Sequence, residues 1–283
     1  MYAPQSFVKE FEIKNFYTAF EMYCSSTFSY SGESHDFWEM VYVIDGSVGV
    51  SADERVYTLS RNNIIFHKPM EFHRIWSERG TSPSVFIMSF SLNRNLRSFN
   101  SGVFELDNTQ RQLLFELMNF LRMSLPEYDP YCARNDFLPS KRGNDNTLLH
   151  FAANYAENFL LSLKSSGNMI TSMQTKEALI YKNAVRVMEK NIYADLSVPE
   201  IAELCMVSKS TLKDIFSKYA GIGIHKYYLL MKINYSLSLL SEGYSVAEIS
   251  RVLSFSSQNY FSMVFRREMG MSPSEYKKKS ENA

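Results

Sequence analysis

Residues 198–219 read VPEIAELCMVSKSTLKDIFSKY, and residues 246–270 read VAEISRVLSFSSQNYFSMVFRREMG. Both stretches begin with a short, partly apolar segment, pass through a turn, and continue into a segment whose apolar residues recur at intervals of four. The second stretch repeats the first after about 48 positions, and its turn is one residue longer. Apolar residues spaced by three and four positions indicate amphipathic helices. The pattern therefore predicts two similar units, each made of a short helix, a turn and a second helix.

Each unit begins with a helix-capping signal. Ser197 lies three residues before Glu200, and Ser245 lies three residues before Glu248. At this spacing the serine side chain accepts from the backbone of the glutamate, while the glutamate side chain accepts from the backbone of the serine, which forms a capping box. We therefore expect one helix to begin after each serine. In the helices that follow the turns, the first unit matches the second at three positions. Ser208, Leu212 and Phe216 correspond to Ser257, Phe261 and Phe265, respectively.

The second helix of each unit has a polar face. A helix with such a face fits the major groove of DNA, where its side chains reach base edges and phosphates. An ordinary helical bundle with a solvated face is the alternative interpretation, and the tandem repetition favours DNA. The polar-face positions are Lys209, Ser210, Lys213, Asp214 and Ser217 in the first unit, and Gln258, Asn259, Ser262, Met263 and Arg266 in the second.

The segment from about residue 179 to residue 280 resembles the DNA-binding domain of the AraC/XylS family of bacterial transcription regulators. Leu239 and Leu240 fall where the helix that links the two units of that family carries a leucine pair. Three residues depart from the family pattern: Ser254 replaces the usual Gly, Ser250 the usual Ala, and Lys232 the usual Arg. The residues of SFSSQNYFSMVFRREMGMSPSEY that match the family signature are Phe255, Tyr260, Phe261, Phe265, Gly270, Pro273 and Tyr276.

The resemblance implies what the chain binds. It implies double-stranded DNA and RNA polymerase as partners of a homodimer that responds to a small-molecule effector, for which a sugar or another small metabolite is the expected class. Asp214 is the least suitable DNA contact, because a carboxylate beside phosphates weakens binding unless it accepts from a cytosine amino group. By position, base and backbone contacts are assigned to Ser210, Lys213 and Asp214, and to Gln258, Asn259, Ser262 and Arg266.

Residues 6–91 have a different pattern, with short stretches rich in Val, Ile, Tyr and Phe between turn residues. Regular short strands favour a small barrel or sandwich. Turns are expected near Asp45-Gly46 and Asn62-Asn63. The predicted antiparallel strands lie within 39–51, 55–69, 72–76 and 84–90.

The stretch from Ser34 to Trp76 resembles the cupin-like sensor barrel at the N-terminus of the same family. Glu39 and Gly46 have the cupin spacing, and Pro69 with His73 is similar to the second cupin motif. The expected fold is therefore α+β with two domains, namely an N-terminal cupin-like β-barrel with accessory helices and a C-terminal all-α domain with two helix-turn-helix units.

The barrel offers a candidate effector site. His35, Phe37 and Glu39 alternate along one predicted strand and so share a face, and His73 joins them from a later strand. Plain barrel core is the alternative interpretation of these side chains. We expect a small polar ligand to contact His35, Phe37, Glu39, Tyr42, His73 and Trp76.

A metal-dependent cupin enzyme fused to a helical domain is the rival function. Two histidines and one carboxylate with open positions would suit iron. However, Phe37 stands where catalytic cupins usually place a second histidine, and no general acid or base stands out nearby. We therefore expect no metal, no cofactor and no catalysis. The sequence also lacks a Gly-rich phosphate loop and a Gly-x-Ser-x-Gly elbow, which leaves nucleotide hydrolysis and esterase chemistry without support.

Residues 107–164 predict two amphipathic helices, with one apolar stripe around Leu113–Leu121 and a second around Leu148–Leu163. The stripes can cover the barrel or form a dimer seam through Leu149, Ala156, Phe159 and Leu163, and the pattern leaves both open. Residues 165–178 are polar and form the expected linker. The predicted domains are thus 1–164 and 179–283.

The C-terminal part of the chain is more basic than the rest. Residues 179–283 hold 14 Lys plus Arg against 10 Asp plus Glu, whereas residues 1–178 hold 16 against 20. A mildly basic C-terminal part is compatible with DNA binding.

No signal-peptide pattern is present, and no apolar run reaches the ~18 residues of a membrane span. We therefore expect a cytoplasmic protein. Cys24, Cys132 and Cys205 are too few and too distant for a disulfide framework.

Overall fold

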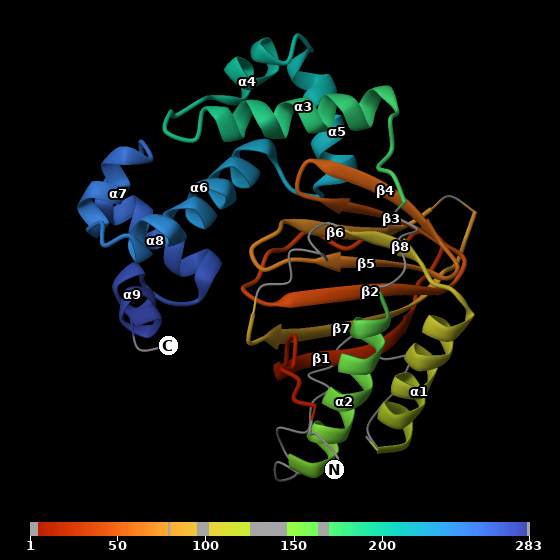
Figure 1. Cartoon of the computed structure of the whole chain (residues 1–283). Helices are drawn as coiled ribbons and strands as arrows, with labels where there is room; N and C mark the ends of the chain where they lie inside the picture. Colours follow the sequence, from red (N-terminus) through yellow and green to blue (C-terminus); the bar gives the residue numbers. More distant parts are fainter. Residues whose placement is uncertain (1–4, 79, 95–101, 125–145, 164–169, 282–283) are drawn as a thin grey trace. The chain divides into compact units, whose positions relative to one another are not determined.

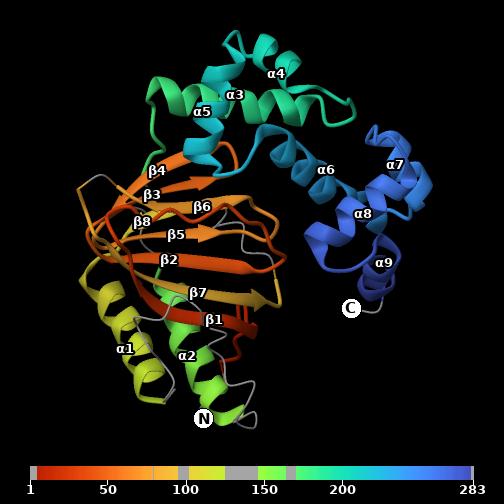
Figure 2. The same cartoon turned by 180° about the vertical axis from the view of Figure 1, so that it is seen from behind.

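The computed structural model describes residues 5–78, 80–94, 102–124, 146–163 and 170–281. The chain divides into two compact units (Figures 1 and 2). One contains 1–52 and 57–172, and the other contains 53–56 and 173–283. None of the helices in the described ranges is both long and apolar enough to cross a bilayer.

The first unit contains two antiparallel sheets, which confirms the predicted β-rich fold. The larger sheet has the order β1-β7-β2-β5-β8 and the smaller has the order β4-β3-β6. Turns with positive φ at Gly46 and Asn62 connect successive strands, as the sequence predicts. The strands are β1 Ile13–Tyr23, β2 Trp38–Asp45, β3 Ser47–Ala52, β4 Arg55–Ser60, β5 Asn63–His67, β6 His73–Ser77, β7 Ser84–Leu92 and β8 Val103–Glu105.

Alternation along β2 divides the core of this unit in two. Met40 belongs to a cluster that packs with the helices, whereas Val41 and Val43 belong to a second cluster that includes residues of both sheets. Successive side chains of a strand point to opposite faces, so Glu39 shares the face of Val41 and Val43. This register positions the barrel site described below.

Helices α1 (Asn108–Ser124) and α2 (Asn146–Leu163) lie side by side (Figures 1 and 2). Their apolar stripes are buried in one cluster with side chains of the larger sheet. Ala156, Phe159 and Leu163 are almost completely buried in their own chain. The stripe therefore covers the sheet, and the alternative prediction of a dimer seam through these residues is wrong.

The second unit is helical apart from residues 53–56, and both predicted capping boxes are present. Ser197 caps α4 and Ser245 caps α7, each with the reciprocal bond to the glutamate three residues on. The first helix begins at Lys176, inside the segment predicted to be linker; residues 164–169 lie outside the described ranges. The helices are α3 Lys176–Lys190, α4 Val198–Leu204, α5 Lys209–Tyr219, α6 Ile224–Ser241, α7 Val246–Val252, α8 Gln258–Met269 and α9 Pro273–Glu281.

The cysteines fit the expectation of structural thiols where they can be placed. Cys24 and Cys205 are free and buried. Burial raises the pKa of the Cys24 thiol to about 11, so this group stays protonated at neutral pH. Cys132 lies outside the described residues.

Candidate DNA interface and barrel site

The second helices of the two units, α5 and α8, have one buried and one exposed face. Leu212, Ile215 and Phe216 of α5 are buried, and so are Phe261, Val264 and Phe265 of α8. Ser262 is half-buried, while the other predicted polar-face residues are exposed, namely Lys209, Ser210, Lys213, Asp214, Ser217, Gln258, Asn259, Met263 and Arg266.

The start of each of these helices is fixed by a serine cap. Ser208 accepts from the backbone N–H of Thr211 at 3.1 Å, and Ser257 accepts from that of Tyr260 at 3.1 Å. Side-chain caps of this kind satisfy backbone donors that have no partner within the helix. The caps therefore define where each polar face begins.

Helix α6 is hydrogen-bonded to both helix-turn-helix units. Tyr228 donates to the carbonyl of Ala194 at 2.9 Å, just before α4. Lys232 donates to the carbonyl of Leu253 at 2.8 Å, at the end of α7, and lies over the rings of Tyr228 and Phe255. Burial lowers the pKa of the Lys232 ammonium, and these contacts provide its partners. The hydrogen bonds of Tyr228 and Lys232 thus connect α6 to both helix-turn-helix units and fix their spacing.

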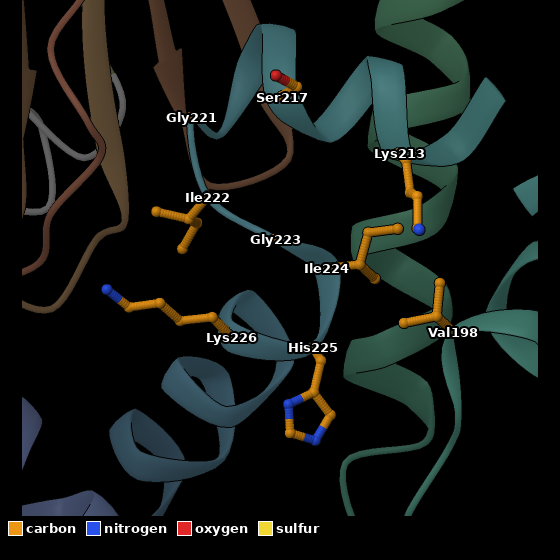
Figure 3. Close-up of a pocket in the computed structure, with 9 residues that line it drawn as sticks. All are labelled: Val198, Lys213, Ser217, Gly221, Ile222, Gly223, Ile224, His225 and Lys226. Carbon is orange, nitrogen blue, oxygen red and sulfur yellow. The ribbon is translucent and has the colours of Figure 1, made fainter. Parts of the chain in front are cut away.

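A hollow of about 450 Å³ borders α5 and the turn into α6 (Figure 3). Its aliphatic wall consists of Val198, Ile222 and Ile224. Lys213 extends from α5 toward Ile224 and Val198, while Lys226 extends in a different direction. The hollow lies beside a candidate DNA-contacting lysine and coincides with no predicted effector residue.

In the barrel, four acidic and imidazole side chains converge. A bridge between Glu33 and His73 and the start of β2 bring Glu33, His35, Glu39 and His73 together, with one potential ligand atom from each lying within 4.8 Å of the others. His73 Nε2 is 3.3 Å from one oxygen of Glu39, and His35 Nε2 is 3.7 Å from the other. These are ion-pair distances, but neither Nε2 makes a hydrogen bond of good geometry.

The electrostatics of the cluster are dominated by Glu39. Burial alone would raise the pKa of Glu39, but the neighbouring imidazoles of His35 and His73 outweigh it and hold that pKa well below its usual value. Burial likewise acts to lower the pKa of His73, but the Glu39 carboxylate raises it to about 9. The Glu39 carboxylate and the His73 imidazole thus interact strongly, and together they can bind a polar molecule.

A second buried pair lies beside the cluster. His67 bonds to Glu71 at 2.8 Å, and the His67 ring stacks on His73 at 4.3 Å between centroids. Burial lowers the pKa of His67, with the charge of His73 acting in the same direction. Neither His67, Glu71 nor Glu33 was identified as a functional residue from the sequence. His67 pairs with Glu39 across β2 and β5, a relationship of strand register that leaves no local pattern in the sequence.

The predicted effector residues divide into two groups. Phe37 joins His35, Glu39 and His73, because its ring stacks on His35 at 3.8 Å. It does so from an irregular segment, since β2 begins only at Trp38; the predicted alternation of residues 35, 37 and 39 along a strand is therefore wrong.

Tyr42 and Trp76 lie elsewhere. Tyr42 packs with the helix-side cluster, on the opposite face of β2 from Glu39. Trp76 lies against Gly49 and beneath the guanidinium of Arg74, on the opposite face of β6 from His73. Their assignment to one site with His35 is corrected by this alternation of faces.

Comparison with known protein families covers both units. A profile described as a helix-turn-helix domain matches residues 194–279, and one described as an AraC-like ligand binding domain matches residues 16–118. The chain belongs to the AraC/XylS family of transcription regulators. The all-helical region thus contains the helix-turn-helix domain, and the β-rich region contains the AraC-like ligand-binding domain.

Curated relatives of this AraC-type chain are regulators by name. The Msm operon regulatory protein of Streptococcus mutans is 24% identical over 286 residues, which cover 96% of this chain and 97% of that protein. The probable transcriptional regulator LumQ of Photobacterium leiognathi is 30% identical over 90 residues, which cover 31% of this chain and only 36% of LumQ. The solved structure of ToxT from Vibrio cholerae covers 95% of this chain and 98% of its own, with 16% identity and a TM-score of 0.38.

The departures from the AraC/XylS pattern have structural consequences. Ser254, which replaces the usual glycine, has φ +52°, and Met206 at the corresponding place in the first unit has φ +56°. Residues with a side chain are strained in this left-handed region. The family's glycine is therefore explained by the turn, and Ser254 is held there by its bond to the carbonyl of Tyr193 at 2.6 Å.

Proposed function

We propose that this regulator reads a specific DNA sequence through α5 and α8 and that a small polar effector bound by His35, Glu39 and His73 controls it. The proposal that the protein reads DNA is supported most strongly by the pair of capped helices with exposed polar faces, whose helix-turn-helix units are both bonded to α6. Two helices held in this way can enter successive major grooves on one side of a duplex, about 34 Å apart.

The proposed DNA-contacting residues fall into two chemical classes, with positively charged and amide side chains. Lys209, Lys213 and Arg266 supply positive charge for phosphates or for guanine edges, and Gln258 and Asn259 have the amide groups that pair with adenine. Among the described residues, Lys209 and Lys213 form no salt bridge. Their charge is therefore available to DNA.

The proposed effector is a small molecule with a hydroxyl or carboxylate group, such as a sugar or another metabolite. Glu39 and His73 are each less than a tenth exposed, and Nε2 of His35 and of His73 is buried without a hydrogen-bond partner. Such buried polar groups favour a ligand that supplies the missing hydrogen bonds. We assign the barrel to sensing and not to catalysis, and place the protein in the cytosol with DNA and RNA polymerase.

We further propose that the active species is a homodimer, because pairing doubles the DNA contacts. The outer surfaces of α1 and α2 expose Phe115, Phe151 and Leu161, and these replace the buried stripe of α2 as the candidate contact. Size measurement by light scattering tests it. A monomer at micromolar concentration, both free and bound to DNA, would contradict the proposal.

The function as a whole is tested by a gel-shift experiment with the DNA upstream of the gene, together with a screen for turnover of candidate effectors. We expect a discrete complex with upstream DNA, a change in its affinity on addition of the effector, and no turnover. Turnover of a small molecule without any DNA complex would favour the cupin enzyme.

A further inference from the structure

The barrel cluster has the dimensions of a metal site. At bond lengths of about 2.1 Å, two adjacent ligands of an ion stand about 3 Å apart and two opposite ligands about 4.2 Å apart. The separations of Glu39 from His73 and from His35, 3.3 and 3.7 Å, lie within this range, and Glu33 is 3.9 Å from His73 Nε2. Since all four ligand atoms lie within 4.8 Å, a small closure of side chains would bring them onto one ion.

Both imidazoles present the nitrogen that a metal requires. His35 Nδ1 is 3.0 Å from the carbonyl of Phe37, and His73 Nδ1 is 3.0 Å from the carbonyl of Glu71. A carbonyl oxygen only accepts, so each Nδ1 carries the proton and donates it. In the neutral ring Nε2 then has a free lone pair, and in both residues Nε2 is buried without a hydrogen-bond partner.

The same bonds and two stacks fix the rings. His35 stacks on Phe37 at 3.8 Å, and Phe37 in turn stacks on Tyr17 at 4.1 Å. His73 stacks on His67 at 4.3 Å. Backbone bonds to the distal imidazole nitrogen and rigid support of the rings are the usual features of histidines that coordinate metals. The sequence predicted no metal because neither Glu33 nor these hydrogen bonds could be recognised from it.

We propose that Glu33, His35, Glu39 and His73 bind one first-row divalent transition-metal ion such as Zn²⁺. Two imidazoles with two carboxylates suit this class of ion, whereas Mg²⁺ and Ca²⁺ prefer oxygen ligands alone. The Glu33 side chain is 44% exposed, against 14% or less for the other three. The open side of the site is thus at Glu33, where an effector can reach the ion.

The test is calorimetric titration of the chelator-treated full chain with ZnCl₂, and with MgCl₂ as a control. We expect one Zn²⁺ bound per chain and no binding of Mg²⁺. Glu33→Gln should weaken Zn²⁺ binding at least tenfold, and His73→Asn should abolish it. His225→Asn, which changes an exposed histidine of the helical unit, should leave it unchanged and serves as the matched control.

Failure of the fold is separated from failure of the proposal by circular dichroism. If His73→Asn unfolds the barrel, the half-exposed Glu33→Gln decides the result. Absence of Zn²⁺ binding by the wild-type chain would overturn the proposal. Equal affinity of the wild-type chain and Glu33→Gln would also overturn it, because the four-ligand site would then be wrong.

The role of the ion in effector binding rests on the proposed function, but metal binding is measured without DNA. A chain that selects its upstream DNA but binds no Zn²⁺ would overturn this inference alone. A chain that binds Zn²⁺ through these residues but shows no DNA preference would overturn the proposed function and leave the metal site intact.

Discussion

The ammonium group of Lys232, almost completely buried in the middle of α6, donates to the carbonyl of Leu253 at the end of α7 at 2.8 Å. Lysine is rarely buried without partners, because its charge is costly to remove from water. Here a carbonyl at a helix C-terminus and two aromatic rings provide them. This single side chain ties the connecting helix to the second recognition unit.

Lys232→Met should therefore lower the free energy of unfolding. The substitution keeps most of the side-chain volume but leaves the carbonyl of Leu253 without this donor, at an expected cost of about 1 to 3 kcal/mol. Urea unfolding of the full chain measures the change, with the exposed Lys226→Met as control. Equal midpoints for the two variants would show that the buried ammonium contributes nothing to the helical unit.

Met206→Gly should stabilise the chain by about 1 kcal/mol, because φ +56° is strained for methionine and free of cost for glycine. Ser254→Gly relieves similar strain but loses the bond to Tyr193, so its gain should be smaller. Thermal unfolding compares the two. Met263→Gly, at an exposed position within α8, should instead destabilise by about 1 kcal/mol. A loss of stability in Met206→Gly would refute the strain argument.

Lys213→Ala and Gln258→Ala should each weaken binding to the specific site by about 1 to 3 kcal/mol if both residues read bases. Each should relax the preference at a different position of the site, because α5 and α8 belong to different units. Binding to a panel of single-base variants of the site measures this, with Lys190→Ala on α3 as control. A uniform loss across all sequences would assign both residues to phosphates.

A fragment of residues 176–283 should fold alone and retain its sequence preference. Its helices bury a core of their own, which includes Tyr181, Phe216, Tyr227 and Phe265. Circular dichroism and DNA binding check the two parts of this prediction. A fragment that remains unfolded would show that the barrel is needed for its structure.

Local patterns made much of the fold predictable. The capping boxes at Ser197 and Ser245 require residues only three positions apart, so their spacing alone was sufficient. The strands around Asp45-Gly46 were likewise visible from alternation and turn residues. For α2 the period predicted the buried stripe, but a period does not tell whether a sheet or a second chain covers it.

The barrel site was only partly predictable, because it depends on contacts between distant segments. Glu33 reaches His73 through an isolated bridge, and His67 faces Glu39 through strand register; neither relationship leaves a local pattern. Tyr42 was misassigned because its strand turns it to the face opposite Glu39. Residue type suggested a ligand site, but only the register defined its members.

The most direct test of the central claim is the affinity of the full chain for its own upstream duplex and for a scrambled duplex of equal composition, measured across a range of salt concentrations. We predict that the upstream duplex binds at least about 10³-fold more tightly. We also predict that binding weakens steeply with salt, because Lys and Arg contacts release counterions. Footprinting should show protection of two adjacent major-groove segments. Equal affinity for the two duplexes, or binding that does not change with salt, would contradict the claim that α5 and α8 read DNA.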